Sequence, residues 1–205
     1  MKNELREQGR EAKRRSAQMK LTLAPLEADV NFAAQELQKN QRNQFWRRTV
    51  VRCLLAATEA LLWNMRNVAP AVAAVSRVEL TPHELEIINE KRVVLREGKT
   101  ETRPYWLKFR DNIKATFEMF AKVHGVTLVW KDSADLDALC QTYELRNRLM
   151  HPKRPYDPEV SDSAIEAAQR GANWFVCEYE RLMRESWESV PEIVNRRKSE
   201  RQSHE

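Results

Sequence analysis

The stretch Leu136–Pro152, which reads LDALCQTYELRNRLMHP, decides how this chain is interpreted. At about 100° per residue, its apolar side chains fill one broad arc of a helix. Arg146 falls inside that arc and Asn147 lies at its flank. Because Pro152 cannot continue a helix and disfavours helical geometry in the preceding residue, the helix is expected to end near Met150.

The end of this predicted helix brings together an arginine, an amide and His151. A guanidinium group on a buried face is costly unless an anion or hydrogen bonds meet it. These residue types suit the cleavage of RNA without a metal ion, because a 2′-OH that attacks its own phosphate needs a proton acceptor, a proton donor and positive charge. Histidine transfers protons, and the arginine guanidinium donates two parallel hydrogen bonds to the oxygens of a phosphate. The other interpretation is a cationic Arg/His pair that only complements the helix dipole.

The run Arg146-Asn147-Arg148-Leu149-Met150-His151-Pro152 resembles the Arg-x4-6-His motif of HEPN domains, a family of α-helical nucleotide- and RNA-binding proteins. Asn147 stands where that family often has a polar residue. The resemblance implies a helical bundle, usually dimeric, in which the motifs of two protomers meet at the interface. It also implies metal-independent endoribonuclease activity, with toxin–antitoxin pairs or phage defence as the setting and an antitoxin protein as a candidate partner.

The motif pattern alone is weak, because the chain matches it twice more, at Arg77–His83 and Arg197–His204. Neither of these pairs has Asn after the arginine. The first straddles a helix start, and the second lies in a polar tail. Only Arg146–His151 combines the Asn, a helix end and a following proline.

The segment after the motif is basic and contains a tyrosine, and Pro152 and two further prolines favour an extended backbone. Such a loop suits either phosphate binding and base stacking or a simple change of chain direction. Some HEPN toxins carry a tyrosine two residues after the histidine, where this chain has Lys153. The residues expected to contact flanking RNA are Arg148, Lys153, Arg154 and Tyr156.

The catalytic candidates are Arg146, Asn147 and His151, with Glu59 as a supporting residue. Arg146 stabilises the transition state in this hypothesis, His151 transfers protons, and Asn147 holds Arg146 or a phosphate oxygen. Glu59 orients Arg146 or Arg52, or else forms an ordinary ion pair within its own helix.

The composition is that of a helical protein with a charged surface. The 205 residues are 42% hydrophobic and 32% charged, with only 4 Gly and a formal net charge of +5. Positive charge is concentrated in residues 1–20, and it is compatible with RNA without proving it. Cys53, Cys140 and Cys177 are expected to be buried free thiols, and no ligand cluster predicts a metal or cofactor. A cytoplasmic location is expected, since no signal peptide or membrane span is visible.

The predicted fold is all-α, an up-and-down bundle of four to five main helices with extended termini. Its parts are a charged arm (1–24), a HEPN-like domain (25–190) and a charged tail (191–205). Helix boundaries are set by prolines, glycines and capping residues. The expected elements are a helix from Pro25, an apolar helix Gln44–Asn67 closed by Pro70, a helix from Thr81-Pro82 to Glu97 ended by Gly98, a polar loop Lys99–Arg103, a helix Tyr105–His124 ended by Gly125, an extended connector Val126–Trp130, the motif helix capped by Ser133, and a last helix capped by Ser161 or Ser163 and followed by Pro191.

Two histidines outside the motif also need a role. His83 is expected on the surface, and His124 is expected at a core edge or as a capping residue, with a second catalytic histidine as the alternative. The non-enzymatic hypotheses for the chain are a HEPN-like module that binds RNA or nucleotides without cleaving them, and a helical interaction protein in which Arg146 pairs with Glu59.

Overall fold

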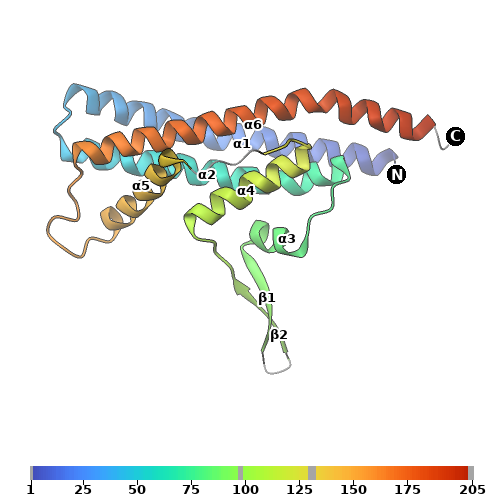
Figure 1. Ribbon diagram of the computed structural model, residues 1–205, viewed down its shortest axis with the longest axis horizontal. Coiled ribbons are helices and arrows are strands. Elements are labelled where there is room, and N and C mark those ends of the chain that lie inside the picture. Colours follow the sequence, from blue (N-terminus) through green and yellow to red (C-terminus); the bar gives the residue numbers. More distant parts are fainter. Residues whose placement is uncertain (1, 97–98, 129–132, 203–205) are drawn as a thin grey trace. The chain divides into compact units, whose positions relative to one another are not determined.

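The computed structural model describes residues 2–96, 99–128 and 133–202 (Figure 1). Within these residues the chain forms six helices and one two-stranded antiparallel sheet. The predicted helical bundle is therefore confirmed as the fold class, whereas the sheet was not predicted. The elements are α1 (Lys2–Lys39), α2 (Gln44–Ser76), α3 (Pro82–Asn89), β1 (Lys91–Arg96), β2 (Lys99–Pro104), α4 (Phe109–His124), α5 (Ala134–Met150) and α6 (Asp162–Gln202).

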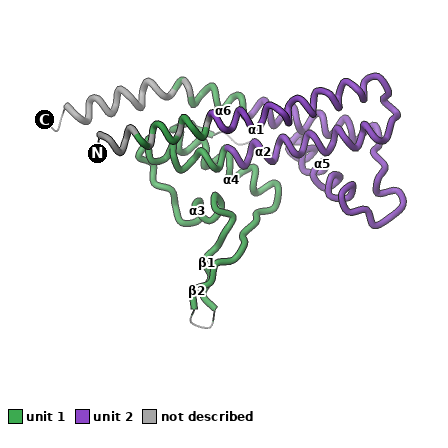
Figure 2. Tube along the Cα trace, turned by 180° about the vertical axis from the view of Figure 1, so that it is seen from behind, with its two compact units in different colours: residues 1–15, 65–129, 179–205 green, residues 16–64, 130–178 purple. Residues whose placement is uncertain are grey.

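The chain divides into two compact units, shown in separate colours in Figure 2. The first comprises residues 1–15, 65–129 and 179–205, and the second comprises residues 16–64 and 130–178. Helices α1, α2 and α6 contribute a segment to each unit, so both units contain mainly helices.

The second unit contains α5, which carries the motif and packs against α2 and α6. One buried cluster joins Val51 of α2, Leu145 and Leu149 of α5, and Ala168 of α6. A second joins α1 to α2 through Ala33, Leu37 and Val50. Burial of apolar side chains between helices, as in these two clusters, is the main source of stability for packed helices.

The first unit is built around a cluster that joins α2 to α4. Ala69 and Ala73 of α2 pack against Met119 and Val123 of α4. Arg66 of α2 is 8% exposed, and its guanidinium donates to Asn112 Oδ1 at 2.8 Å and to Glu90 Oε1 at 2.9 Å. Burial lowers the pKa of Arg66, and Glu90 opposes that shift.

Three prolines that were predicted to bound helices lie inside them instead. Helix α1 runs through Pro25, α2 through Pro70 and α6 through Pro191. A proline removes one backbone donor and crowds the preceding turn, but a helix continues where the freed carbonyl groups find other partners. The carbonyl that loses its helical donor at Pro70 is that of Arg66, and the neighbouring Asn67 carbonyl accepts a hydrogen bond from Arg15 Nη1 at 2.5 Å. Pro25 is exposed, so water can reach the carbonyl groups around it.

The prediction for residues 81–104 was right at its start and wrong afterwards. Thr81 caps α3 with a full capping box to Glu84. The helix then ends at Asn89, because Glu90 takes a left-handed conformation with φ 51°. The expected rest of the helix and the expected polar loop instead form the hairpin β1–β2, and its turn residues 97–98 lie outside the described residues.

The helix expected over Tyr105–His124 begins later, at Phe109. The Tyr105 N–H donates to the Glu90 carbonyl at 2.8 Å, which holds this residue at the base of the hairpin. Trp106, which lies within the range expected to be helical, precedes the helix and is 75% exposed. Gly125 ends α4 with φ 68°, as predicted. The last two residues of the expected extended connector Val126–Trp130 lie outside the described residues.

Candidate functional site

Helix α5 has the bounds that the sequence predicts. The Ser133 hydroxyl accepts the Leu136 N–H at 3.1 Å and caps the start. The last helical residue is Met150, and His151 follows with φ −133° and ψ 62°. The His151 N–H donates to the Asn147 carbonyl at 3.0 Å, so the backbone of this candidate histidine is fixed to the last turn.

A glycine on α6 sets the distance between α6 and the motif helix. A Cβ atom placed on Gly171 would lie 2.5 Å from the Leu139 backbone nitrogen and 2.6 Å from its Cα. Real Cβ atoms do not approach backbone atoms so closely. The position of α5 against α6 therefore depends on the missing side chain of Gly171.

Arg146 forms an ion pair with Glu59 of α2. Its side chain is 22% exposed, and its guanidinium carbon lies 5.0 Å from the centre of the Tyr143 ring. The position of Arg146 in the apolar arc required a partner for its charge, and Glu59 supplies one. Of the pairings left open for Glu59, the structure has the contact with Arg146, between two helices.

The other motif residues are placed differently. His151 and Arg148 are exposed, and Asn147 is partly buried. Within the described part of the chain, the Arg146 guanidinium contacts Glu59 and the Tyr143 ring, and it makes no hydrogen bond with the His151 ring. One chain therefore provides the arginine and the histidine at the same helix end, but their side chains do not contact each other.

Two arginines of α2 reach the end of the motif helix and the loop beyond it. Arg52 Nη2 donates to the Leu149 carbonyl at 3.3 Å, and Arg48 Nη1 donates to the Pro158 carbonyl at 3.3 Å. Both arginines lie on the same helix as Glu59. The C-terminal carbonyl groups of a helix carry partial negative charge, so a guanidinium there is favourable.

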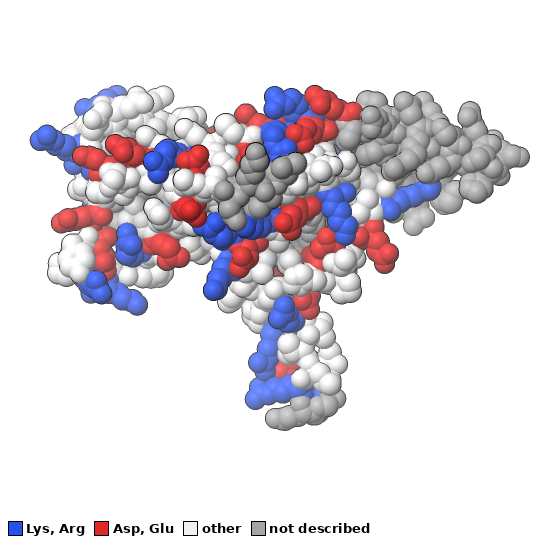
Figure 3. Space-filling model, in the orientation of Figure 1, with Lys and Arg blue, Asp and Glu red and all other residues white. Residues whose placement is uncertain are grey.

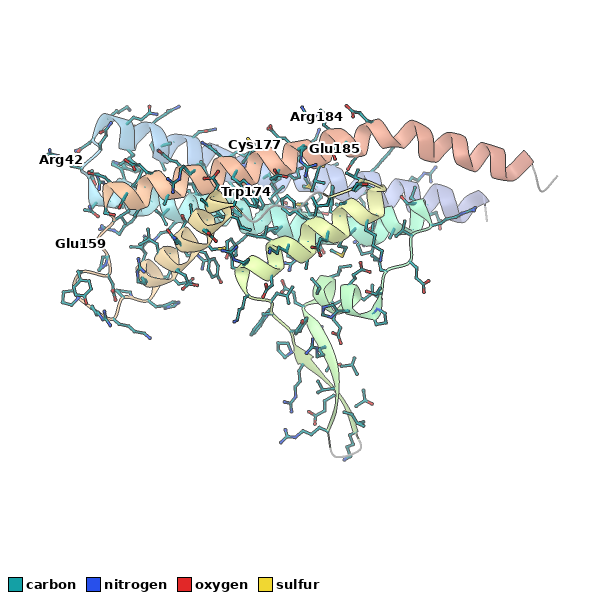
Figure 4. The ribbon with its side chains drawn as sticks, viewed as in Figure 1. Arg42, Glu159, Trp174, Cys177, Arg184 and Glu185 are labelled. Carbon is teal, nitrogen blue, oxygen red and sulfur yellow. The ribbon has the colours of Figure 1, made fainter. Side chains whose placement is uncertain are left out.

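The loop between α5 and α6 is held by its own carboxylate. Asp157 accepts the Lys153 N–H at 2.7 Å and the Arg154 N–H at 2.9 Å (Figure 4 shows this loop near the label of Glu159). The hydrogen bond from Lys153, then that from Arg154, and the nearby charges of Arg154 and Arg148 lower the pKa of Asp157, while burial opposes this. The loop is thus ordered while its cationic side chains remain exposed.

The RNA-contact candidates of the loop lie beside one another. Lys153, Arg154 and Tyr156 are exposed, and Tyr156 retains 57% of its accessible surface. Arg154 Nη1 donates to the Tyr156 hydroxyl at 3.0 Å. An aromatic ring next to a cation can stack on a base while the cation meets a phosphate group.

The residues that anchor the far end of this loop were not predicted from the sequence. Gln44 makes a reciprocal pair of hydrogen bonds with Val160, from Nε2 to the carbonyl at 3.0 Å and from the Val160 N–H to Oε1 at 2.9 Å. Arg47, 8% exposed, donates to the same carbonyl at 2.8 Å and forms an ion pair with Asp162. Their separation of more than 110 positions from Val160 left no sequence signal for these contacts.

Of the remaining histidines, His83 and His124 lie in the described part of the chain. The side chain of His83 is 60% exposed, as predicted, with Nδ1 3.5 Å from Glu86 Oε2. His124 lies against Phe120, with ring centres 4.3 Å apart, and burial lowers its pKa to about 4. The competing match at Arg77–His83 therefore has a surface histidine in the first turn of α3, which is a different setting from a helix end.

The cysteines differ from the expectation in one case. Cys53 and Cys140 are partly buried, but Cys177 on α6 is exposed. Burial raises the pKa of Cys53, and the charge of Asp29 adds to that effect. The expectation of three buried thiols is wrong for Cys177.

The described residues contain neither a metal-binding cluster nor a membrane-spanning helix. No group of three His, Cys, Asp or Glu side chains in them is arranged to hold a metal ion. None of the described helices combines the length and the apolar character needed to cross a bilayer. Comparison with known proteins found no matching family model, no similar curated protein and no similar solved structure.

Proposed function

We propose that this protein is a metal-independent endoribonuclease that cleaves single-stranded RNA. The observation that carries the proposal is the end of α5, where Arg146 is partly buried against Glu59 and His151 is exposed at the last turn. The ordered loop that follows presents Lys153 and Arg154 beside that end. Fixed positive charge next to a proton-transferring group is what phosphodiester cleavage through the 2′-OH requires.

The proposed reaction needs only the RNA and these side chains. A base removes the proton of the 2′-OH, the 2′ oxygen forms a bond to phosphorus, and the bond from phosphorus to the 5′ oxygen breaks. An acid then gives a proton to the departing 5′ oxygen. The products are a 2′,3′-cyclic phosphate and a 5′-OH end. His151 transfers protons, Arg146 stabilises the charge on the phosphorane-like transition state, and Asn147 holds Arg146 or a phosphate oxygen.

A two-fold dimer is part of the proposal. Each chain carries one motif, and two proton transfers are needed, so two motifs in one cleft supply a base and an acid. In this arrangement Arg148, Lys153, Arg154 and Tyr156 hold the flanking nucleotides. A toxin or phage-defence effector, restrained by an antitoxin protein, is the biological setting that we propose.

The second candidate function is a helical interaction module or a non-catalytic RNA-binding module. The ion pair between Arg146 and Glu59 favours it, because a guanidinium that neutralises a carboxylate between two helices already has a structural task. Removal of one partner of a partly buried pair leaves the other charge unmatched. This function predicts that substitution of Arg146 affects folding first.

The deciding experiment measures cleavage of single-stranded RNA in EDTA by the wild type and by Arg146→Ala and His151→Ala variants. We expect both variants to lose at least about a hundredfold in rate, in line with loss of a general acid–base group or of charge stabilisation. Product ends are mapped by their chemistry, and a 2′,3′-cyclic phosphate is expected. Circular dichroism and sedimentation show whether fold and dimer persist.

Matched controls come from the same residue types. His83→Ala removes an exposed histidine outside the motif, and Arg42→Ala removes an exposed arginine in the turn between α1 and α2 (Figure 4); both are expected to cleave normally. Wild-type protein that cuts no RNA, combined with unfolding of the Arg146→Ala variant, would assign the interaction module instead. A strict need for added metal would contradict the proposed chemistry.

A further inference from the structure

The hairpin β1–β2 separates its charged and apolar side chains onto two faces. Successive residues of a strand alternate between faces, and directly opposite residues share a face. The register pairs Arg92 with Arg103 and Arg96 with Lys99, so these four cations lie on one face. With them lie Val94 and its partner Glu101, and the other face holds Lys91, Val93, Leu95, Thr100, Thr102 and Pro104. Figure 3 shows the blue side chains gathered along one side of the hairpin and white residues along the other.

Like charges directly opposite in a sheet destabilise the strand pair, so each pair of cations needs compensation. The inner pair has it: Arg92 Nε lies 3.2 Å from Glu86 Oε2 and its guanidinium carbon 3.9 Å from the Tyr105 ring centre, while Arg103 Nη2 lies 3.2 Å from Glu101 Oε2. The outer pair differs, since no ion pair with another described residue is formed by Arg96 or Lys99. Two adjacent cations that no described carboxylate neutralises attract an anionic group.

The hairpin is fixed at its base and exposed beyond it. Tyr105 N–H donates to the Glu90 carbonyl at 2.8 Å, and Arg92 bridges back to α3 through Glu86. Farther out, Val93 and Leu95 are 62% and 76% exposed, and every residue of β2 is exposed. The cationic face is therefore presented to solvent on a defined backbone.

We propose that this cationic face, formed by Arg92, Arg96, Lys99 and Arg103, binds the phosphate backbone of single-stranded RNA. The inference rests on the proposed function, and it adds an RNA-binding arm outside the motif. The inner and outer pairs are four residues apart, about 13 Å at the rise of a strand, so they meet different phosphates of one backbone. An anionic membrane fits less well, because the apolar side chains that would enter it face away from the cations.

The test measures binding of a fluorescent 2′-O-methyl oligoribonucleotide by anisotropy at several salt concentrations. This RNA lacks the 2′-OH, so binding is measured without cleavage. The Arg96→Gln/Lys99→Gln variant is compared with Lys91→Gln/Lys108→Gln, which loses the same charge at exposed positions outside the cationic face. We expect the first variant to bind about tenfold more weakly at low salt and to lower the salt slope by about 1.4, which is two phosphate contacts on a single strand. The second is expected to change less than half as much.

Equal losses in the two variants, no loss in either, or no RNA binding by the wild type would each overturn the inference. So would a wild type that prefers vesicles containing phosphatidylserine, with that binding lost in the first variant and RNA binding kept. Cleavage of unmodified RNA by the same proteins separates the two proposals. If RNA binding depends on the hairpin cations but no RNA is cleaved, the RNA-binding arm is supported and the nuclease is contradicted. If RNA is cleaved but the Arg96→Gln/Lys99→Gln variant binds RNA like the wild type, the nuclease is supported and the arm is contradicted.

Discussion

His124 ends α4 with its ring against Phe120, and burial lowers its pKa from 6.5 to about 4. In the unfolded chain the imidazole takes up a proton near pH 6.5, and in the folded chain only near pH 4. Between these values the unfolded state binds more protons, so stability is full above about pH 6.5 and falls as the pH falls toward 4. The loss is of the order of 1–3 kcal/mol.

Urea unfolding at pH 7 and pH 5 measures this effect. We expect a His124→Leu variant to lose most of the difference between the two pH values, because its side chain cannot be protonated. His83→Gln, at an exposed position, serves as the control and should keep the wild-type difference. An unchanged difference in His124→Leu would assign the pH dependence to carboxylates.

Single residues were predicted well where a local rule determines them. Ser133, Thr81 and Gly125 act at helix ends as their residue types require. The need of Arg146 for an anion was also visible, since its place on the helix wheel follows from spacing alone. That Glu59 meets it depends on how α2 packs against α5, and helix periodicity carries no such information.

At the scale of elements, the approach of α6 to α5 depends on Gly171. We expect Gly171→Ala to destabilise the protein by about 2 kcal/mol or more, because the new methyl group would overlap the Leu139 backbone. Gly9→Ala is the matched control, since its Cβ would meet nothing within 4 Å and alanine is the better helix former. Thermal unfolding of both variants provides the measurement.

The two substitutions are expected to have different effects on the melting temperature. Gly171→Ala should lower the melting temperature, and Gly9→Ala should leave it unchanged or raise it. Similar stability in the two variants would mean that α5 and α6 are not packed at the distance described. Because α5 carries the motif, RNA cleavage should fall with Gly171→Ala as well.

The predicted bounds of helices and strands were wrong where one local sequence signal is compatible with two structures. Pro25, Pro70 and Pro191 each indicated a boundary, yet α1, α2 and α6 continue through them. The stretch 91–104 contains β-branched residues on both sides of Gly98, which is typical of a hairpin, but its charged residues also suit a helix. The left-handed conformation of Glu90 ends the helix, and a glutamate gives no sequence signal for such a turn.

At the scale of the whole molecule, the proposed catalytic centre needs two chains. We expect a dimer with a mass of about 48 kDa, twice the chain mass of 24.1 kDa. Cleavage per chain should fall on dilution in parallel with dissociation, because a monomer would supply one motif only. Sedimentation and RNA cleavage, measured over the same concentrations, test this expectation.

A substitution of Met150 also tests whether two chains share the catalytic centre. Met150 is 51% exposed and adjacent to His151, so Met150→Asp would place a charge in an interface built around the motif. Leu21→Asp, at a 76% exposed position on α1, controls for a new carboxylate on an apolar surface position. A monomer that cleaves RNA at the full rate would refute the shared centre while leaving the motif chemistry intact.

The hydrogen bonds that anchor the segment after His151 also affect its susceptibility to proteolysis. Trypsin needs several residues of pliable backbone to enter its cleft, and it does not cut before proline, so the bond after Lys153 is its one target among residues 151–160. The amide groups on both sides of that bond are held by Asp157, and the far end is fixed at Val160. This segment, although rich in exposed cations, should survive limited digestion intact.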